Sequence, residues 1–260
     1  MTDEIPIARR ELIASRLAAG QAVVAATLAA EFGVSEDAIR RDLRALAAQG
    51  QCRRVYGGAL PITPASAPMA ARMDEARERK EALARTGAAQ VRRGELLFLD
   101  SGSTNLALAD ALPEDHELTV ATNSVDIAAA LLRRGDVRLI MVGGAVDPVV
   151  GGCVDAAAVA SVLNMNIDAC FLGACAVSPR EGVSAFEFAD ASFKRAVLAR
   201  SRRTFILSTT DKLGAQASHR IADLDALECV IVEHDAPRAQ ITALSKAGTT
   251  VLRADPPAGL

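Results

Sequence analysis

The sequence predicts a small N-terminal domain of helices and a β-hairpin, followed by a larger α/β domain with a mostly parallel sheet. Short helical patterns and a glycine-containing hairpin fill the first 60 residues, and a proline-rich stretch, Pro61–Pro68, follows. Prolines favour extended backbone and disfavour helix interiors. Beyond it, short apolar runs alternate with helical patterns, as in βαβ units. We therefore expect domains at 1–60 and 72–260, joined by a linker at 61–71.

In the N-terminal domain, the third helical pattern carries the most informative residues. Gly33 permits a tight turn, and Ser35 is a candidate N-cap for the helix that follows. One face of this helix is apolar, and its residues are Ile39, Leu43 and Leu46. The opposite face carries arginines, which therefore project away from the core. A hairpin follows, in which Gly57 and Gly58 permit the turn.

A helix, a turn, a second helix and a basic hairpin form a layout that binds DNA. Residues at the start of the second helix reach base edges, and the candidates are Ser35, Asp37, Ala38 and Arg41. Other arginines are better placed for backbone phosphates, and these are Arg40, Arg44, Arg53 and Arg54. On spacing alone, a helical interaction domain with a solvated arginine face remains the alternative.

After the linker, the segment Arg72–Arg93 mixes charges of both signs. Glu75 precedes Arg79 at the i,i+4 spacing that supports an exposed helix face, so a solvated helix explains the segment. Strands are predicted where the later apolar runs lie, at 96–99, 118–120, 137–142, 169–172, 204–207, 229–232 and 249–252. These runs are continuous rather than alternating, as expected where helices cover both faces of a sheet.

Three successive predicted strands end in small polar or glycine-containing loops. These loops are Asp100–Asn105, Thr122–Ser124 and Gly143–Gly144. The carboxyl ends of parallel strands share one edge of the sheet, where open α/β folds bind ligands, and helix N-termini there attract anions. We expect a phosphate group at this edge, with Lys194 and Lys212 as candidate cations. For any one loop an ordinary cap or turn is an equally good explanation, and a surface lysine is usually only solvated.

Both halves of the chain resemble the DeoR-type bacterial transcription regulators. In the first half the resemblance rests on residues 34–43, Gly50, Arg54 and 57–59. In the second half it rests on residues 100–104, 122–124, 143–144, 168–174, 182–183, 194–195 and 211–214. Three positions depart from the family pattern. Ala38 stands where threonine is typical, Cys52 stands where an apolar residue is typical, and Ser192 stands where relatives often have glutamate.

The resemblance implies a ribose-5-phosphate-isomerase-like fold for the larger domain. It also implies operator DNA and a phosphorylated sugar as partners, and a homo-oligomer, either a dimer or a tetramer. The chain would then be a repressor that the sugar phosphate releases from its operator or retunes on it. With the loops described above, the expected effector site comprises Asp100, Ser101, Gly102, Ser103, Thr104, Thr122, Asn123, Ser124, Gly143, Gly144, Gly173, Lys194 and Lys212.

A sugar-phosphate isomerase of the same fold is the alternative function. Such an enzyme needs a carboxylate base to move a proton between neighbouring carbons. Pentose-phosphate isomerases of this fold carry an Asp-Gly-Ala-Asp-Glu run, whereas the corresponding segment here has Leu172, Cys175 and Ala176 in place of the three carboxylates. We therefore expect a binding site without catalysis.

Composition excludes several other classes of protein. Half of the 260 residues are apolar, 23% are charged and the formal net charge is −3, which is ordinary for a globular protein. Apolar runs are far shorter than the about 20 residues that cross a bilayer, and no signal-peptide pattern is present. The five cysteines are widely spread, and the three histidines lack metal-ligand spacing. We expect a cytoplasmic protein without a metal or other cofactor and without a membrane partner.

Overall fold

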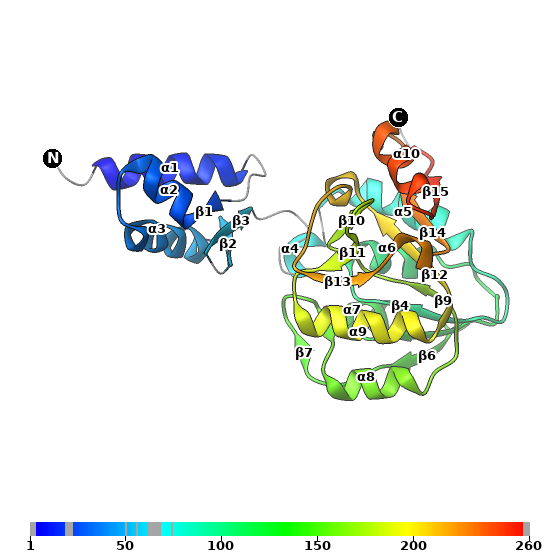
Figure 1. The fold of residues 1–260 in the computed structure, drawn as a ribbon. Coiled ribbons are helices and arrows are strands. Elements are labelled where there is room, and N and C mark those ends of the chain that lie inside the picture. The colour runs from blue at the N-terminus through cyan, green and yellow to red at the C-terminus, as the bar shows by residue number, and fades with distance from the viewer. Residues whose placement is uncertain are drawn as a thin grey trace. The chain divides into compact units, whose positions relative to one another are not determined.

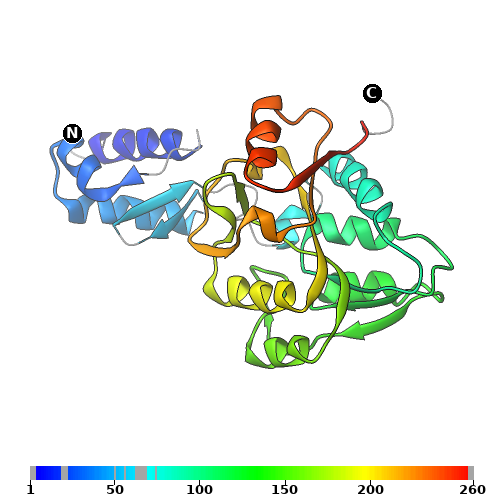
Figure 2. The same cartoon turned by 45° about the vertical axis from the view of Figure 1, so that its right-hand side comes forward.

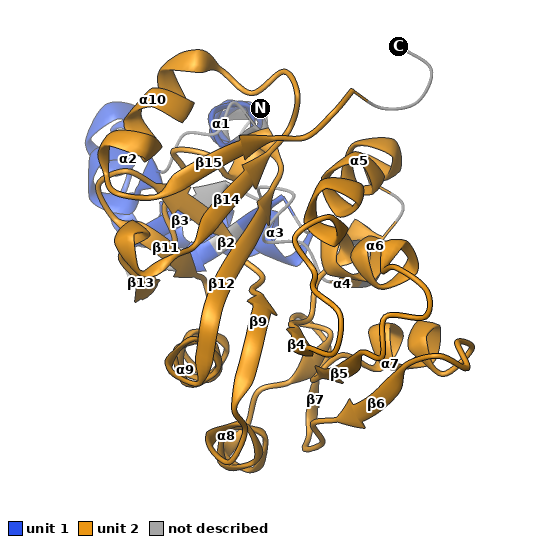
Figure 3. Ribbon diagram, turned by 90° about the vertical axis from the view of Figure 1, so that its right-hand side faces the viewer, with its two compact units in different colours: residues 1–66 blue, residues 67–260 orange. Residues whose placement is uncertain are grey.

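The computed structural model describes residues 4–18, 23–49, 51–55, 57–61, 69–73 and 75–256. The chain divides into two compact units, residues 1–66 and 67–260 (Figure 3). Across the described ranges, no helix has the length and apolar character needed to span a membrane. Most of the predicted linker, residues 62–68, lies outside these ranges, so the domain boundaries at 60 and 72 stay predictions.

The first unit packs helices against a small antiparallel sheet (Figure 1). The helices are α1 (Glu4–Ala18), α2 (Ala25–Phe32) and α3 (Glu36–Ala48). The sheet has the order β1-β3-β2, formed by β1 (Val23–Val24), β2 (Cys52–Val55) and β3 (Gly58–Pro61). The apolar face predicted for α3 lies in the core, since Ile39, Leu43 and Leu46 are buried with Ile13 and Leu28. The unit therefore has the winged helix-turn-helix arrangement that the sequence predicts.

Local sequence explains how α3 is positioned. Gly33 ends α2 in the left-handed conformation, with φ of 63°, which glycine adopts without steric cost. The Ser35 Oγ then accepts the N–H of Ala38 at 3.3 Å and caps α3. Within α3, the buried Asp42 accepts a hydrogen bond from Nε of Arg9 at 2.7 Å. This ion pair ties α3 to α1.

The second unit contains a seven-stranded parallel sheet with the order β15-β14-β12-β9-β4-β5-β6. Its strands are β4 (Leu96–Leu99), β5 (Thr119–Thr122), β6 (Arg138–Met141), β9 (Ile167–Phe171), β12 (Ser201–Ser208), β14 (Cys229–Val232) and β15 (Thr250–Arg253). Each of these strands overlaps one of the predicted apolar runs, and β12 begins three residues before its run. The predicted fold class, an α/β unit with a mostly parallel sheet after a winged helix-turn-helix unit, is therefore confirmed.

Helices cover both faces of this sheet (Figure 3). One face packs against α5 (Arg77–Ala88), α6 (Ser103–Ala111) and α7 (Val125–Leu131). The other face packs against α8 (Ala156–Leu163), α9 (Phe188–Ala199) and α10 (Arg238–Lys246); α8 and α9 lie side by side, green and yellow in Figure 2. Successive residues of β4 alternate between the two cores, with Phe98 in one and Leu97 and Leu99 in the other. Continuous apolar strands follow from this double burial.

Several short elements were not predicted. They are α4 (Met69–Arg72), β7 (Val146–Asp147), β8 (Gly152–Cys153), β10 (Ala176–Ser178), β11 (Gly182–Ala185), β13 (His219–Ala222) and the 3-10 turns Thr210–Lys212 and Leu224–Ala226. The strands among them form a β7-β8 hairpin and a sheet with the order β10-β11-β13. The prediction that 72–93 is a solvated helix is wrong in part, because α5 begins only at Arg77 and buries Lys80.

Candidate DNA-binding and effector-binding sites

The exposed face of α3 presents the arginines that the sequence predicts at a DNA interface. Arg40, Arg41 and Arg44 are all exposed. Arg40 pairs with Glu36 at 2.7 Å and with Asp37 at 3.7 Å. The other two donate from Nε to main-chain oxygens one turn earlier in the helix, at 3.3 and 3.2 Å. Their charged ends therefore lie along one side of α3.

A surface cavity of about 480 Å³ brings the helix and the hairpin together within this unit. Arg40 of α3 and Arg54 of β2 both line it. The turn beside it depends on glycine, because a Cβ on Gly58 would lie 2.0 Å from the carbonyl oxygen of Val23. Ser35 and Ala38 lie at the start of α3, and the side chain of Arg53 falls outside the described part of the structure. Helix and hairpin thus line one cavity, to which they contribute Arg40, Arg54 and Glu36.

In the second unit, the strands β12, β9, β4 and β5 are neighbours, and they end at the same edge of the sheet. Loops after three of them are joined by hydrogen bonds. Asp100 accepts the N–H of Gly173 at 2.8 Å, and the side-chain oxygen of Asn123 accepts the N–H of Ser101 at 3.0 Å. The structure therefore brings these four predicted effector residues together.

Lys194 on α9 reaches the same cluster from a fully buried position. Its Nζ lies 3.5 Å from Oδ2 of Asp100 and donates to Asp190. Burial alone lowers the pKa of Lys194, but the two carboxylates outweigh it and hold the pKa above its ordinary value. Burial also raises the pKa of Asp100 to about 6; Lys194 opposes this shift and Asp190 adds to it. Lys194 is thus a charged group balanced by internal carboxylates.

Sequence reasoning missed two cations at this edge, Arg72 and Lys80. The Nζ of Lys80 is buried and donates to the main-chain oxygen of Arg72. Burial lowers the pKa of Lys212; the thiol of Cys175 opposes this, while Arg72 and Lys80 lower the pKa further. Arg72 and Lys80 are thus in contact, and both lie close enough to Lys212 for their charges to lower its pKa. A signal was present, since Lys80 shares the i, i+3, i+4, i+7 spacing of Leu83, Ala84 and Gly87, which are all buried.

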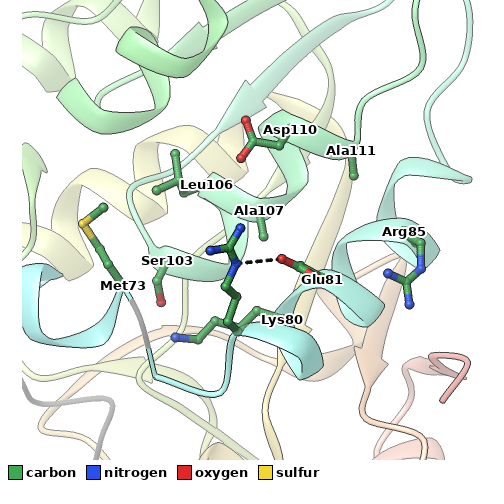
Figure 4. A pocket seen from close by; sticks show the side chains of 10 residues that line it. Met73, Lys80, Glu81, Arg85, Ser103, Leu106, Ala107, Asp110 and Ala111 are labelled. Carbon is green, nitrogen blue, oxygen red and sulfur yellow. Dashed lines mark hydrogen bonds and ion pairs between the residues drawn. The ribbon is translucent and has the colours of Figure 1, made fainter. Parts of the chain in front are cut away.

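Polar groups that could meet a ligand also lie in the first loop. The Oγ of Ser101 is buried, and it has no hydrogen-bond partner among the described residues. Ser103 lines a cavity of about 430 Å³ between α5 and α6, together with Lys80 (Figure 4). Gly102 precedes Ser103, and Thr104 follows it as a buried residue at the start of α6. Hydroxyl groups and buried cations at a helix start can hold a phosphate.

Other predicted effector residues have structural partners. Thr122 donates from Oγ1 to the oxygen of Leu99 at 2.7 Å, and Ser124 caps α7. Gly144 lies against Asp155, since a Cβ on this glycine would be 2.5 Å from Oδ1 of Asp155, and Gly143 beside it is exposed.

Among the residues that the structure describes, no group of His, Cys, Asp and Glu could hold a metal ion.

A winged helix-turn-helix unit joined to an α/β unit with a cation-rich strand edge defines a DNA-binding regulator with a sensor domain. Comparison with known families gives the same class. The family model of the DeoR-like helix-turn-helix domain matches residues 9–65, and that of the DeoR C terminal sensor domain matches residues 75–234. This chain belongs to the DeoR family of transcriptional regulators.

Individual relatives agree with this assignment. The chain is 30% identical to the glycerol-3-phosphate regulon repressor of Escherichia coli (strain K12), over 81% of this chain and 84% of that protein. It is 32% identical to the HTH-type transcriptional regulator YgbI of the same organism, over 95% and 98%. A solved structure of ribose 5-phosphate isomerase A from Neisseria gonorrhoeae aligns with 15% identity and a TM-score of 0.39, over 54% of this chain and 55% of that one. The prediction that this protein is a regulator rather than an enzyme is confirmed by its family.

Proposed function

We propose that this protein is a cytoplasmic bacterial repressor that leaves or loosens its hold on operator DNA when a phosphorylated sugar binds its sensor unit. The observation that carries the proposal is the set of polar loops and buried cations at the carboxyl edge of β12, β9, β4 and β5. A relative that aligns over 84% of its own length is named a glycerol-3-phosphate regulon repressor, and its name supports both repression and a phosphorylated effector.

On DNA, the first residues of α3 would read bases in the major groove, and the remaining arginines would contact backbone phosphates. The base-reading candidates are Ser35, Asp37, Ala38 and Arg41. Arg40, Arg44, Arg53 and Arg54 would fix the register of the protein on the duplex. Ser35 also caps α3, so its hydroxyl is shared between the helix and any base.

In the sensor unit, the phosphate of the effector would be held by Ser101, Ser103, Lys212 and the main-chain N–H groups at the start of α6. The sugar hydroxyls would meet the neighbouring loops after β5 and β9. A homo-oligomer, a dimer or a tetramer, would present two winged units to repeated half-sites. The effector would act through its difference in affinity for the DNA-bound and free states.

The DNA-binding half of the proposal is tested by competition binding on a duplex selected from a random pool. Arg41→Ala should cost about 1–3 kcal/mol on the selected site and little on random DNA. Arg54→Ala is the contrasting variant and should weaken binding to all DNA sequences alike. The slope of log affinity against log salt concentration should fall by about 1. Wild-type protein that shows no sequence preference at physiological salt would refute the proposal.

The sensor half is tested by thermal shift of the full chain with phosphorylated sugars and glycerol 3-phosphate, each beside its unphosphorylated parent. A ligand that binds only the folded state raises the Tm. We expect a shift that requires the phosphate and is lost in Ser101→Ala. Ser161→Ala is the matched control, because its hydroxyl donates a hydrogen bond within α8, on the exposed side of that helix. A shift that is equal with and without the phosphate group would contradict the assignment.

A further inference from the structure

The segment that joins the two units ends in the sensor unit at α4. Strand β3 ends at Pro61, and α4 begins at Met69, so only residues 62–68 separate the winged unit from α4. Arg72 is the last residue of α4. Any change in how α4 sits on the sensor unit therefore changes where the chain leaves toward the winged unit.

Packing links α4 to the strand-end loops. Met69 is buried, and its N–H donates to the oxygen of Val149 at 3.2 Å. A Cβ on Gly151 would lie 2.6 Å from the Met69 side chain, so the β7-β8 hairpin supports α4 directly. The next residue, Gly152, lies against Ser101, because a Cβ there would be 2.9 Å from the Ser101 Cβ. Helix α4, the hairpin and the first loop of the effector site are thus in continuous contact.

The guanidinium of Arg72 lies near the same edge, and the described residues leave one of its nitrogens without a hydrogen-bond partner. Its Nε is buried and has no hydrogen-bond partner among the described residues. Burial lowers the pKa of Arg72, and Cys175, Asp190, Glu75 and Asp100 act against this shift. The buried carboxylates Asp100 and Asp190 already pair with Lys194. A desolvated arginine beside two further cations is suited to a phosphate, which a guanidinium can bind through two parallel hydrogen bonds.

We propose that Arg72 binds the phosphate of the effector and thereby couples effector binding to the DNA-binding unit, because the bound phosphate fixes α4 on the sensor unit. The inference rests on the proposed effector site and adds its regulation. Among the described residues, α4 is held by Met69 and by Lys80, which donates to the main-chain oxygen of Arg72. A bound phosphate would add a contact at the Arg72 guanidinium. An effector that binds only when α4 is docked shifts the population toward that state.

The test uses the full chain, with inorganic phosphate as the probe and chloride at matched ionic strength as the reference. Phosphate affinity is measured by thermal shift, and hydrogen exchange is followed in the peptide that contains α4. The variants are Arg72→Gln, Arg72→Lys and the control Arg92→Gln, whose arginine is exposed just after α5. The Tm of each variant without phosphate reports whether it folds.

We expect phosphate to stabilise the wild type and Arg92→Gln and to slow exchange in α4. Arg72→Gln should bind phosphate about 10- to 100-fold more weakly and lose this protection. Arg72→Lys should keep part of the binding, since it keeps the charge but loses the paired hydrogen bonds. Equal phosphate binding by Arg72→Gln and the wild type would overturn the inference.

The sugar-phosphate screen separates this inference from the proposed function. If a phosphorylated sugar binds wild type and Arg72→Gln equally, the effector site stands and the role of Arg72 falls. If neither inorganic phosphate nor any phosphorylated sugar stabilises the wild type, both the effector site and the role of Arg72 are wrong. If Arg72→Gln binds weakly but α4 exchanges at the same rate with and without phosphate in the wild type, coupling through α4 is wrong.

Discussion

Oδ2 of Asp100 lies 3.5 Å from Nζ of Lys194 and also accepts the N–H of Gly173 at 2.8 Å. One carboxylate thus joins the ends of β4 and β9 to helix α9. A buried carboxylate is unfavourable unless such partners surround it, and removing one partner leaves the others uncompensated. Asp100 therefore links the strand-end loops through its side-chain oxygens, but burial works against its ionised form, so its titration should be visible in the stability of the sensor unit.

Stability should depend on pH through Asp100. Burial, opposed by Lys194, raises the pKa of Asp100 from 3.8 to about 6 in the folded state. The folded state then binds the proton more tightly than the unfolded chain, so this contribution to stability is present below about pH 4 and is lost as the pH rises through about 6. As the pH rises over that interval, the wild type should lose up to about 3 kcal/mol of unfolding free energy. Asp100→Asn, which cannot ionise at this position, should not show that loss. Urea unfolding at several pH values measures the difference, and parallel pH curves would contradict the assignment.

Two predicted effector glycines should respond differently to substitution. A Cβ on Gly173 would lie 2.9 Å from both Oδ2 of Asp100 and the main-chain oxygen of Ser101, whereas a Cβ on Gly143 would meet nothing within 4 Å. Gly173→Ala should therefore cost about 1–3 kcal/mol of stability and abolish binding of a phosphorylated sugar. Gly143→Ala should leave both nearly unchanged. Thermal unfolding and thermal shift of the two variants check this, and similar losses in both would show that Gly143 also lies in the site.

The parallel sheet could be predicted because its strands contain continuous apolar runs, which in central strands such as β9 and β14 are buried on both faces. Strands such as β7 and β8 could not, because each is only two residues long and so shows no apolar run or alternation that would mark a strand. The loops containing Asp100, Ser101 and Asn123 could be predicted because polar residues directly follow apolar runs. Their hydrogen bonds to one another depend on strand order, which the sequence does not state.

Charged residues near α5 were harder to predict. The expected pair of Glu75 with Arg79 suggested a solvated helix, but Arg79 instead pairs with Asp235 at 2.9 Å. Lys80, the next residue, is buried. Neighbouring residues of a helix point in different directions, so charge pairs on one face do not predict whether the adjacent residue is buried or exposed. The apolar spacing around Lys80 was the better guide.

Asp42 should be essential for the stability of the winged unit. Its carboxylate is buried and lies 2.7 Å from Nε of Arg9 and 3.3 Å from Arg10, both on α1. Asp42→Ala leaves the Arg9 guanidinium without its partner, and removal of one member of a buried pair costs about 3–5 kcal/mol. DNA binding should fall on specific and random sequences alike as the unit unfolds. Calorimetry of the full chain measures the loss, and Glu11→Ala, at an exposed position in α1, is the control.

Glu36 should restrain DNA binding through Arg40. The two side chains pair at 2.7 Å and both are about half exposed, so the pair itself contributes little to stability. Glu36→Gln removes a negative charge from the proposed DNA surface and leaves Arg40 available for a phosphate. We expect tighter binding to every sequence and a salt slope steeper by about 1. Fluorescence anisotropy across a salt series, with Glu31→Gln on α2 as a matched control, measures both quantities. A gain confined to one sequence would show that Glu36 reads bases instead.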